Sequence, residues 1–438
     1  MMRKSVTLIA AASVAAAFGF EAAAHDHTVP RGRLIFADHE KPVVSILDLD
    51  TFQVTHRFDV PKPNPVLTMA EGGRYVVIKT GDDAGTVRLL DTGLIRESHG
   101  DHDDIDKAAP KMLDLSLSGE RPAHVVSDEG WLAVFFDGPR PWEKRVDARA
   151  VLLKLNSLDK AQPIRDEWVG QGPQHGIAIP LGRNQWLISV PKEAYVRGED
   201  RSVSSRPDGF QILERKDKAW RTVASFNDAA NKERSCKEFH GHASLDGAHA
   251  FGCHQTIAGD ERSDGGVLIV EKTGGRWSSR KLGYPDARRA STIKAREAST
   301  HMVANYGLKG PYNAFLRIDP KAKTLTAADV FAVPDNQPIC QYEIARDGKR
   351  VANLTPDGKL RIHEIAPAWR QVASFDAVPA FDCQYGAATP TPSLAIVGDS
   401  AFVSDPVNRR IREFHISTLA AGLDAPVDGM PANLATAD

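Results

Sequence analysis

Three histidines stand at matching positions in successive units of an internal repeat: His124, His175 and His242. Each one opens a strand-like stretch, so the three side chains converge if the units pack around a common axis. Three convergent imidazoles form a zinc-type site, because Zn²⁺ takes three or four N, S or O ligands in a tetrahedral arrangement. Glu238, Asp128 or water is the expected fourth ligand.

The same histidines have a second interpretation, in which each only forms hydrogen bonds to the backbone. Three histidines in register favour metal binding over that interpretation. His240 and His254 are weaker ligand candidates from the same part of the chain. Because imidazole must be neutral to bind a metal, the zinc affinity is expected to fall as the pH drops through about 6.5, and to be weaker near pH 5.

A second set of ligand-type side chains lies in residues 97–106, between two strand-like stretches. Histidines and aspartates around a glycine suit the labile capture of a borderline cation, because each ligand set is incomplete. A solvated acidic loop is the alternative. The candidate ligands of this loop are His99, Asp101, His102, Asp103 and Asp104.

The elements that position these residues belong to repeat units spaced by about 43 to 67 residues, with period-2 strands and turn residues between them. Such units are typical of the four-stranded blades of a β-propeller. We therefore predict an all-β propeller over residues 34–420, with a C-terminal tail over 421–438. Eight blades fit slightly better than seven. A two-domain β-sandwich is the structural alternative, but it leaves the recurring histidines and cysteines unexplained.

The two ends of this repeat array look incomplete. The N-terminal unit lacks its first strand, and the C-terminal unit lacks its last one. We therefore expect the ring to be closed by both termini.

The N-terminus has the composition of a signal peptide over residues 1–24, with two basic residues, an apolar run and small residues up to Ala24. The apolar run is about fifteen residues, short of the roughly 20 that span a bilayer. We therefore expect a periplasmic protein without membrane insertion. Cleavage after Ala24 exposes His25 and His27 in a flexible tail over residues 25–33, which offers a further mobile ligand set.

The four cysteines are expected to form two disulfides in an oxidising compartment. A Cys236–Cys253 bridge closes a loop of about 17 residues and contributes about 3 kcal/mol in the chain-entropy model. Cys340 and Cys383 open two following units, where a bridge would join neighbouring inner strands. Ligation of the same metal by their thiolates is the alternative.

The composition and missing motifs exclude several functions. A net charge of −2 provides no basic surface for nucleic acid. The sequence has no nucleophile elbow, phosphate-binding loop or zinc-protease helix. The protein is therefore not expected to be an enzyme. The alternatives are a metal-dependent propeller hydrolase or lactonase, with Glu238 as the acid–base candidate, and a propeller that binds proteins without metal.

Together these features resemble the AztD family of periplasmic zinc metallochaperones, which serve a zinc ABC transporter. The resemblance covers nearly the whole mature chain and rests on the His25-Asp26-His27 tail, the His/Asp-rich loop, and the Pro-x-His openings at His124 and His175. It implies zinc binding and direct transfer of the zinc to the transporter's solute-binding protein. We also expect the protein to be a monomer. The resemblance also implies a tight site at His124, His175 and His242, with the loop and tail as weaker or transfer sites.

Overall fold

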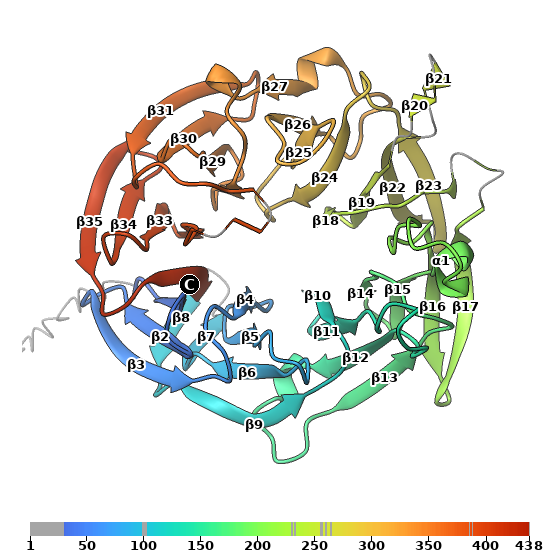
Figure 1. Ribbon diagram of the computed structural model, residues 1–438, viewed down its shortest axis with the longest axis horizontal. Helices are drawn as coiled ribbons and strands as arrows, with labels where there is room; N and C mark the ends of the chain where they lie inside the picture. The colour runs from blue at the N-terminus through green and yellow to red at the C-terminus, as the bar shows by residue number, and fades with distance from the viewer. Residues whose placement is uncertain are drawn as a thin grey trace, which may run out of the picture.

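The computed structural model describes residues 30–98, 103–228, 231, 234–254, 257–258, 261–262, 265–384, 386–387 and 389–437. These residues form eight four-stranded antiparallel sheets, arranged as the blades of a ring (Figure 1). The predicted all-β propeller and the preference for eight blades are confirmed. The predicted signal peptide over residues 1–24, His25 and His27 lie outside the described residues.

Each blade runs from the axis to the rim in four strands, and the blades are numbered 1 to 8 around the ring. The innermost strands, in that order, are β36 (Pro431–Ala437), β4 (Val66–Met69), β10 (Pro122–Asp128), β14 (Ala178–Pro180), β18 (His242–Leu245), β24 (Arg289–Lys294), β28 (Gln341–Ile344) and β32 (Leu394–Val397). The second strands are β1 (Arg33–Asp38), β5 (Tyr75–Lys79), β11 (Trp131–Phe136), β15 (Gln185–Ser189), β19 (Ala248–Cys253), β25 (Met302–Gly307), β29 (Arg350–Leu354) and β33 (Ser400–Asp405).

The two outer positions of the blades follow the same order. The third strands are β2 (Val43–Asp48), β6 (Val87–Asp91), β12 (Arg149–Lys154), β16 (Phe210–Lys216), β22 (Gly266–Thr273), β26 (Ala314–Ile318), β30 (Lys359–Glu364) and β34 (Arg410–His415). The rim strands are β3 (Gln53–Asp59), β9 (Lys111–Leu117), β13 (Arg165–Val169), β17 (Ala219–Phe226), β23 (Arg276–Leu282), β27 (Val330–Ala332), β31 (Arg370–Asp376) and β35 (Ala420–Pro426).

Short elements lie between the blade strands. They are α1 (Glu193–Arg197), the 3-10 turns η1 (Leu155–Ser157), η3 (Ala327–Asp329) and η4 (Pro334–Asn336), and two hairpins, β7 (Leu94–Ser98) with β8 (Asp103–Lys107) and β20 (Ile257–Ala258) with β21 (Glu261–Arg262). No helix in the described part of the chain has the length and apolar character needed to cross a bilayer.

Burial of the strands follows their place in the blade. The middle strands are buried on both faces, because each blade packs against a neighbour on either side; β1, β19 and β33 are buried at every residue. Rim strand β3 alternates between exposed and half-buried residues instead. The core is therefore divided into layers between blades. One such layer, between blades 4 and 5, contains Phe210 and Phe251, whose ring centroids are 4.4 Å apart.

Both chain ends contribute to blade 1. β36 pairs with β1 in antiparallel register, with Ala437 opposite Arg33 and Pro431 opposite Asp38. The expected closure of the ring by both termini is thus confirmed. The predicted tail over residues 421–438 is wrong for residues 421–437, since they form most of β35 and all of β36. The last blade also has the rim strand that the sequence pattern did not indicate.

Both predicted disulfides are formed, between Cys236 and Cys253 and between Cys340 and Cys383. They close loops with sequence separations of 17 and 43 residues, which corresponds to about 3 and 4 kcal/mol in the chain-entropy model. All four cysteines therefore form disulfides. The alternative in which Cys340 and Cys383 ligate a metal as thiolates does not apply to this structure.

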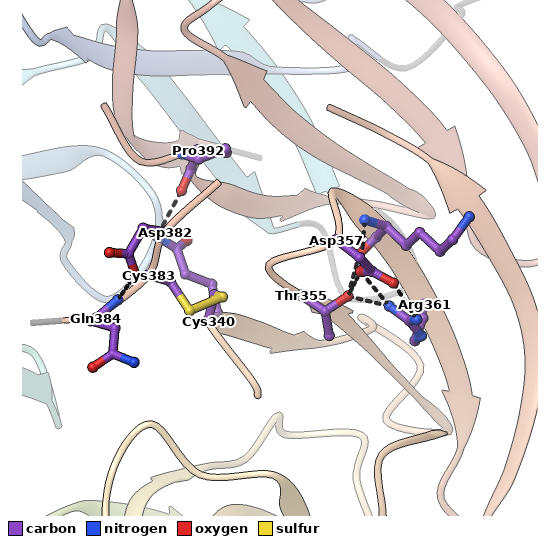
Figure 2. Close-up of a disulfide and its surroundings, with 10 residues drawn as sticks. Cys340, Thr355, Asp357, Arg361, Asp382, Cys383, Gln384 and Pro392 are labelled. Atoms are coloured by element: carbon purple, nitrogen blue, oxygen red, sulfur yellow. Dashed lines mark hydrogen bonds and ion pairs between the residues drawn. A yellow bond between two sulfur atoms is a disulfide. The ribbon is translucent and has the colours of Figure 1, made fainter. Parts of the chain in front are cut away.

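The second disulfide differs from its prediction in one respect. Cys340 directly precedes β28, but Cys383 lies in the long segment between β31 and β32 rather than at the opening of an inner strand. Figure 2 shows Cys383 between Asp382 and Gln384; the Asp382 carboxylate accepts a hydrogen bond from the Gln384 backbone N–H at 2.9 Å. The bridge therefore anchors a connecting segment to blade 7.

Candidate metal site

Three imidazoles from neighbouring blades meet at one mouth of the ring. His124 lies on β10, His175 precedes β14, and His240 precedes β18. Their ring centroids are 4.8, 5.9 and 5.8 Å apart. One ligand atom from each lies within 4.8 Å of the other two, and among the described residues this is the one such group of three. We call it the three-histidine cluster.

The spacing of the cluster suits a zinc ion. Nε2 of His124 lies 3.3 Å from Nε2 of His175. Two nitrogen ligands on tetrahedral zinc, each about 2.0–2.1 Å from the metal, are about 3.3–3.4 Å apart. His124 and His175 therefore already stand at the separation of two zinc ligands, and His240 supplies the third imidazole.

The third histidine of the cluster is not the one that the repeat pattern favoured. His242 lies two residues further on, and its Nε2 is 3.3 Å from Nδ1 of His249. Residues i and i+2 of an extended segment share one face. His240 was expected to face the opposite side from His242 and was therefore ranked as the weaker ligand candidate. That expectation is wrong, because His240 belongs to the cluster and His242 does not.

Gly241 explains how His240 reaches the cluster. Its φ is +81°, and a Cβ at this position would lie 1.7 Å from the backbone oxygen of Ser291 in blade 6. Only glycine allows so close an approach of the two blades. The same contact places Nδ1 of His240 3.2 Å from Oγ of Ser291. That hydroxyl orients the ring and leaves Nε2 available as a ligand.

A buried carboxylate orients His175. Asp137, directly after β11, has Oδ2 2.8 Å from Nδ1 of His175, and its Oδ1 accepts a hydrogen bond from the Gly176 backbone N–H at 3.3 Å. A proton held on Nδ1 leaves Nε2 unprotonated and directed to His124. Carboxylates that hold the far nitrogen of a ligand in this way fix its tautomer and raise its basicity. Asp137 is not among the residues that the sequence pattern singled out, although each repeat ends a strand in an acidic residue.

Two imidazoles of the cluster are neutral over a wide pH range. Burial, reinforced by neighbouring positive or protonatable groups, lowers the pKa of His124 and of His240 to about 3. Neutral imidazole is the form that binds metal. The expected loss of zinc affinity through pH 6.5 therefore does not apply to these two ligands.

Arg289 lowers the pKa of His240 through its charge, and two further cationic side chains act on the cluster. Lys79 donates a hydrogen bond to the backbone oxygen of Ala123, next to His124, and its positive charge helps to lower the pKa of His124. Arg206 lowers the pKa of both His124 and His240 through its charge. Both charges oppose a Zn²⁺ ion held by the three imidazoles, whereas the Asp137 carboxylate favours it. The electrostatic environment thus suits a cation that must also be released.

The other candidate ligands lie apart from the cluster. The Glu238 carboxylate binds Lys192 Nζ at 2.5 Å and His254 Nδ1 at 3.3 Å. Asp128 ends β10, four residues beyond His124, and its Oδ2 lies 3.4 Å from Oγ of Ser244. Neither carboxylate joins the three-histidine cluster, so water is the remaining candidate for the fourth ligand.

The His/Asp-rich loop lies at the tip of the β7–β8 hairpin. His99, Asp101 and His102 are outside the described residues, while the backbone of Asp103 and Asp104 pairs with Ser98 and Glu97. The hairpin leaves blade 2 after Asp91, which pairs with Tyr75 beside the β4–β5 turn. Its base is therefore on the face where the inner strands end, opposite to the cluster.

Replacement of Asp137 by asparagine should weaken zinc binding by about 10- to 100-fold, because the carboxylate that orients His175 is lost. Competition with a chromophoric chelator measures the affinity. Asp405→Asn is the matched control, since Asp405 is an equally buried carboxylate in blade 8 that binds Asn408. Equal zinc affinities of the two variants would show that Asp137 has no role in the site.

Proton release on zinc binding reports the charge state of the cluster. At pH 5.5 an ordinary imidazole is about 90% protonated, so three of them would release about 2.7 protons per zinc. Because His124 and His240 are already neutral, we expect the release of at most about one proton per zinc ion. Calorimetric titration with one equivalent of zinc in buffers of different ionisation enthalpy gives the number. Release of more than two protons would contradict the burial of these imidazoles.

Comparison with known proteins agrees with the fold. The sequence is 26% identical over 436 residues to the zinc chaperone AztD of Citrobacter koseri, covering 98% of this chain and 90% of that protein. A crystal structure of Citrobacter koseri AztD matches with a TM-score of 0.75, and its apo structure with 0.72, each at 24% identity over 92% of this chain and 96% of the other. No model of a known protein family matches the sequence. The chain is thus similar to AztD along nearly its whole length, which confirms the resemblance inferred from its motifs.

Proposed function

We propose that this protein is a periplasmic zinc chaperone, which binds zinc at the three-histidine cluster and transfers it to the solute-binding protein of a zinc ABC importer. The cluster, with its imidazoles at zinc-ligand spacing, is the observation that carries the proposal. The similarity to the zinc chaperone AztD supports zinc as the cargo and a role without catalysis. The two disulfides support export to an oxidising compartment.

Transfer follows from the ligand set. Three imidazoles leave a fourth coordination position for water, and a ligand of the partner can enter there without a free ion being formed. Lys79 and Arg206 oppose the bound charge and so lower the free energy needed to give it up. Asp137 holds His175 in its ligating orientation. We therefore expect His124 and His240 to be replaced first and His175 last.

Capture of zinc is assigned to the two further ligand sets predicted from the sequence. These are the tail, with His25 and His27, and the loop, with His99, Asp101, His102, Asp103 and Asp104. Each set is incomplete and exchanges ligands readily, as a capture site requires. A hydrolytic role finds no support at the cluster, because Glu238, the acid–base candidate, is held by Lys192 and His254.

The experiment compares wild type with a His124→Ala, His175→Ala double variant, both purified from the periplasm. Mass spectrometry should find at least one zinc in the wild type and one fewer in the variant. Zinc-loaded wild type is then mixed with the solute-binding protein in the presence of excess EDTA. Direct transfer should load the partner despite the chelator, since no free zinc is formed, and the double variant should fail to load it.

His363→Gln is the control for unspecific damage, because His363 is a buried histidine in blade 7 that binds Asn353 at 2.6 Å. It should keep wild-type zinc content and transfer. Two results would contradict the proposal: a wild type that carries no zinc and cannot be loaded, or a partner that receives zinc only when EDTA is omitted.

A further inference from the structure

A second pair of imidazoles lies beside the three-histidine cluster. Nε2 of His242 and Nδ1 of His249 are 3.3 Å apart, the separation also found between His124 and His175. It is about the separation of two nitrogen ligands on a tetrahedral zinc ion. His249 is only 6% exposed and His242 is half-buried, so bulk water has little access to the pair. The proposed transfer from the cluster makes no use of this pair.

The register of blade 5 shows where the pair points. His242 is opposite Phe251 and Ser244 is opposite His249 in the β18–β19 ladder, so these four side chains share one face of the sheet. Phe251 packs in the layer between blades 4 and 5. The imidazoles therefore lie along that layer, with His242 at the start of β18 and His249 close to the β18–β19 turn.

His249 also forms part of the wall of a cavity of about 910 Å³ at the opposite mouth of the ring. Five carboxylates line this cavity, against three cationic side chains, Arg183, Lys272 and Arg296. The charges of Asp128 and Glu129 add to the effect of burial in raising the pKa of Glu71. A cation would relieve this repulsion. The acidic residues are Glu71, Asp128, Glu129, Asp246 and Glu297.

We propose that His242 and His249 form a second divalent-cation site of the zinc type, reached from the acidic cavity, with water completing the coordination. Asp128 reaches the same wall, since its Oδ2 lies 3.4 Å from Oγ of Ser244, the residue paired with His249. The inference goes beyond the proposed function, which gives no role to His242 or His249.

The pair lies between the acidic cavity and the three-histidine cluster. The acidic cavity and the base of the β7–β8 hairpin are on the same face of the ring, whereas the three-histidine cluster is at the opposite mouth. His242 is close enough to His124 for the charge of one ring to affect the other. A cation at the pair thus lies between the cavity and the cluster, on the way from one mouth to the other.

Crystals of the full mature chain soaked in zinc provide the direct test. An anomalous difference map at the zinc edge should show one peak at the three-histidine cluster and a second between His242 Nε2 and His249 Nδ1. A peak at the cluster with none at the pair would overturn this inference and leave the proposed function standing. A peak at the pair with none at the cluster would support the inference and contradict the proposed function.

A solution test uses chains in which His25, His27, His99, His102, His124 and His175 are all alanine, so that the tail and the loop keep no histidine and the cluster keeps only His240. This protein should still bind zinc in competition with a chromophoric chelator, and His249→Gln should weaken the binding by at least about tenfold. His363→Gln, the matched buried histidine, should leave it unchanged. Thermal unfolding verifies that each variant is folded. Equal zinc binding by the two glutamine variants would overturn the inference.

Discussion

The pairing of β36 with β1 is the constraint on which the rest of the structure depends. It joins the two ends of the chain in blade 1 and closes the ring, so that every inner strand starts at the same mouth and ends at the other. Residues that open strands in different blades can then meet although they are far apart in the sequence. The three-histidine cluster is such a meeting point, since its members come from the adjacent blades 3, 4 and 5 of the closed ring.

The charges around the cluster balance binding against release. Burial makes His124 and His240 neutral, so no proton has to be displaced from them before a metal binds. Asp137 adds a negative charge behind His175, whereas Lys79 and Arg206 add positive charges close to the site. A structural zinc site would close its coordination shell and neutralise the ion. The three-histidine cluster leaves one coordination position open and does not neutralise the ion. Both properties are consistent with a cation held for transfer.

Much of the fold could be predicted because local sequence patterns determine it. Period-2 strands, turn residues and recurring histidines identified the propeller, and both predicted disulfides are formed although Cys383 does not open an inner strand. β36 escaped prediction because it consists largely of small residues and pairs with the other end of the chain. His240 and Asp137 were missed as central residues for a related reason. Their roles depend on contacts between blades, the approach of Gly241 to Ser291 and the hydrogen bond to His175, which no single repeat contains.

The central claim is that three neutral imidazoles hold a zinc ion, and X-ray absorption at the zinc K-edge tests it most directly. The protein is loaded with one equivalent of zinc at pH 7, so that the tightest site is filled. The account predicts a shell of about four N or O ligands near 2.0–2.1 Å, with the multiple scattering of about three imidazoles and no sulfur. A shell with fewer than two imidazoles, or with a sulfur ligand at about 2.3 Å, would contradict it.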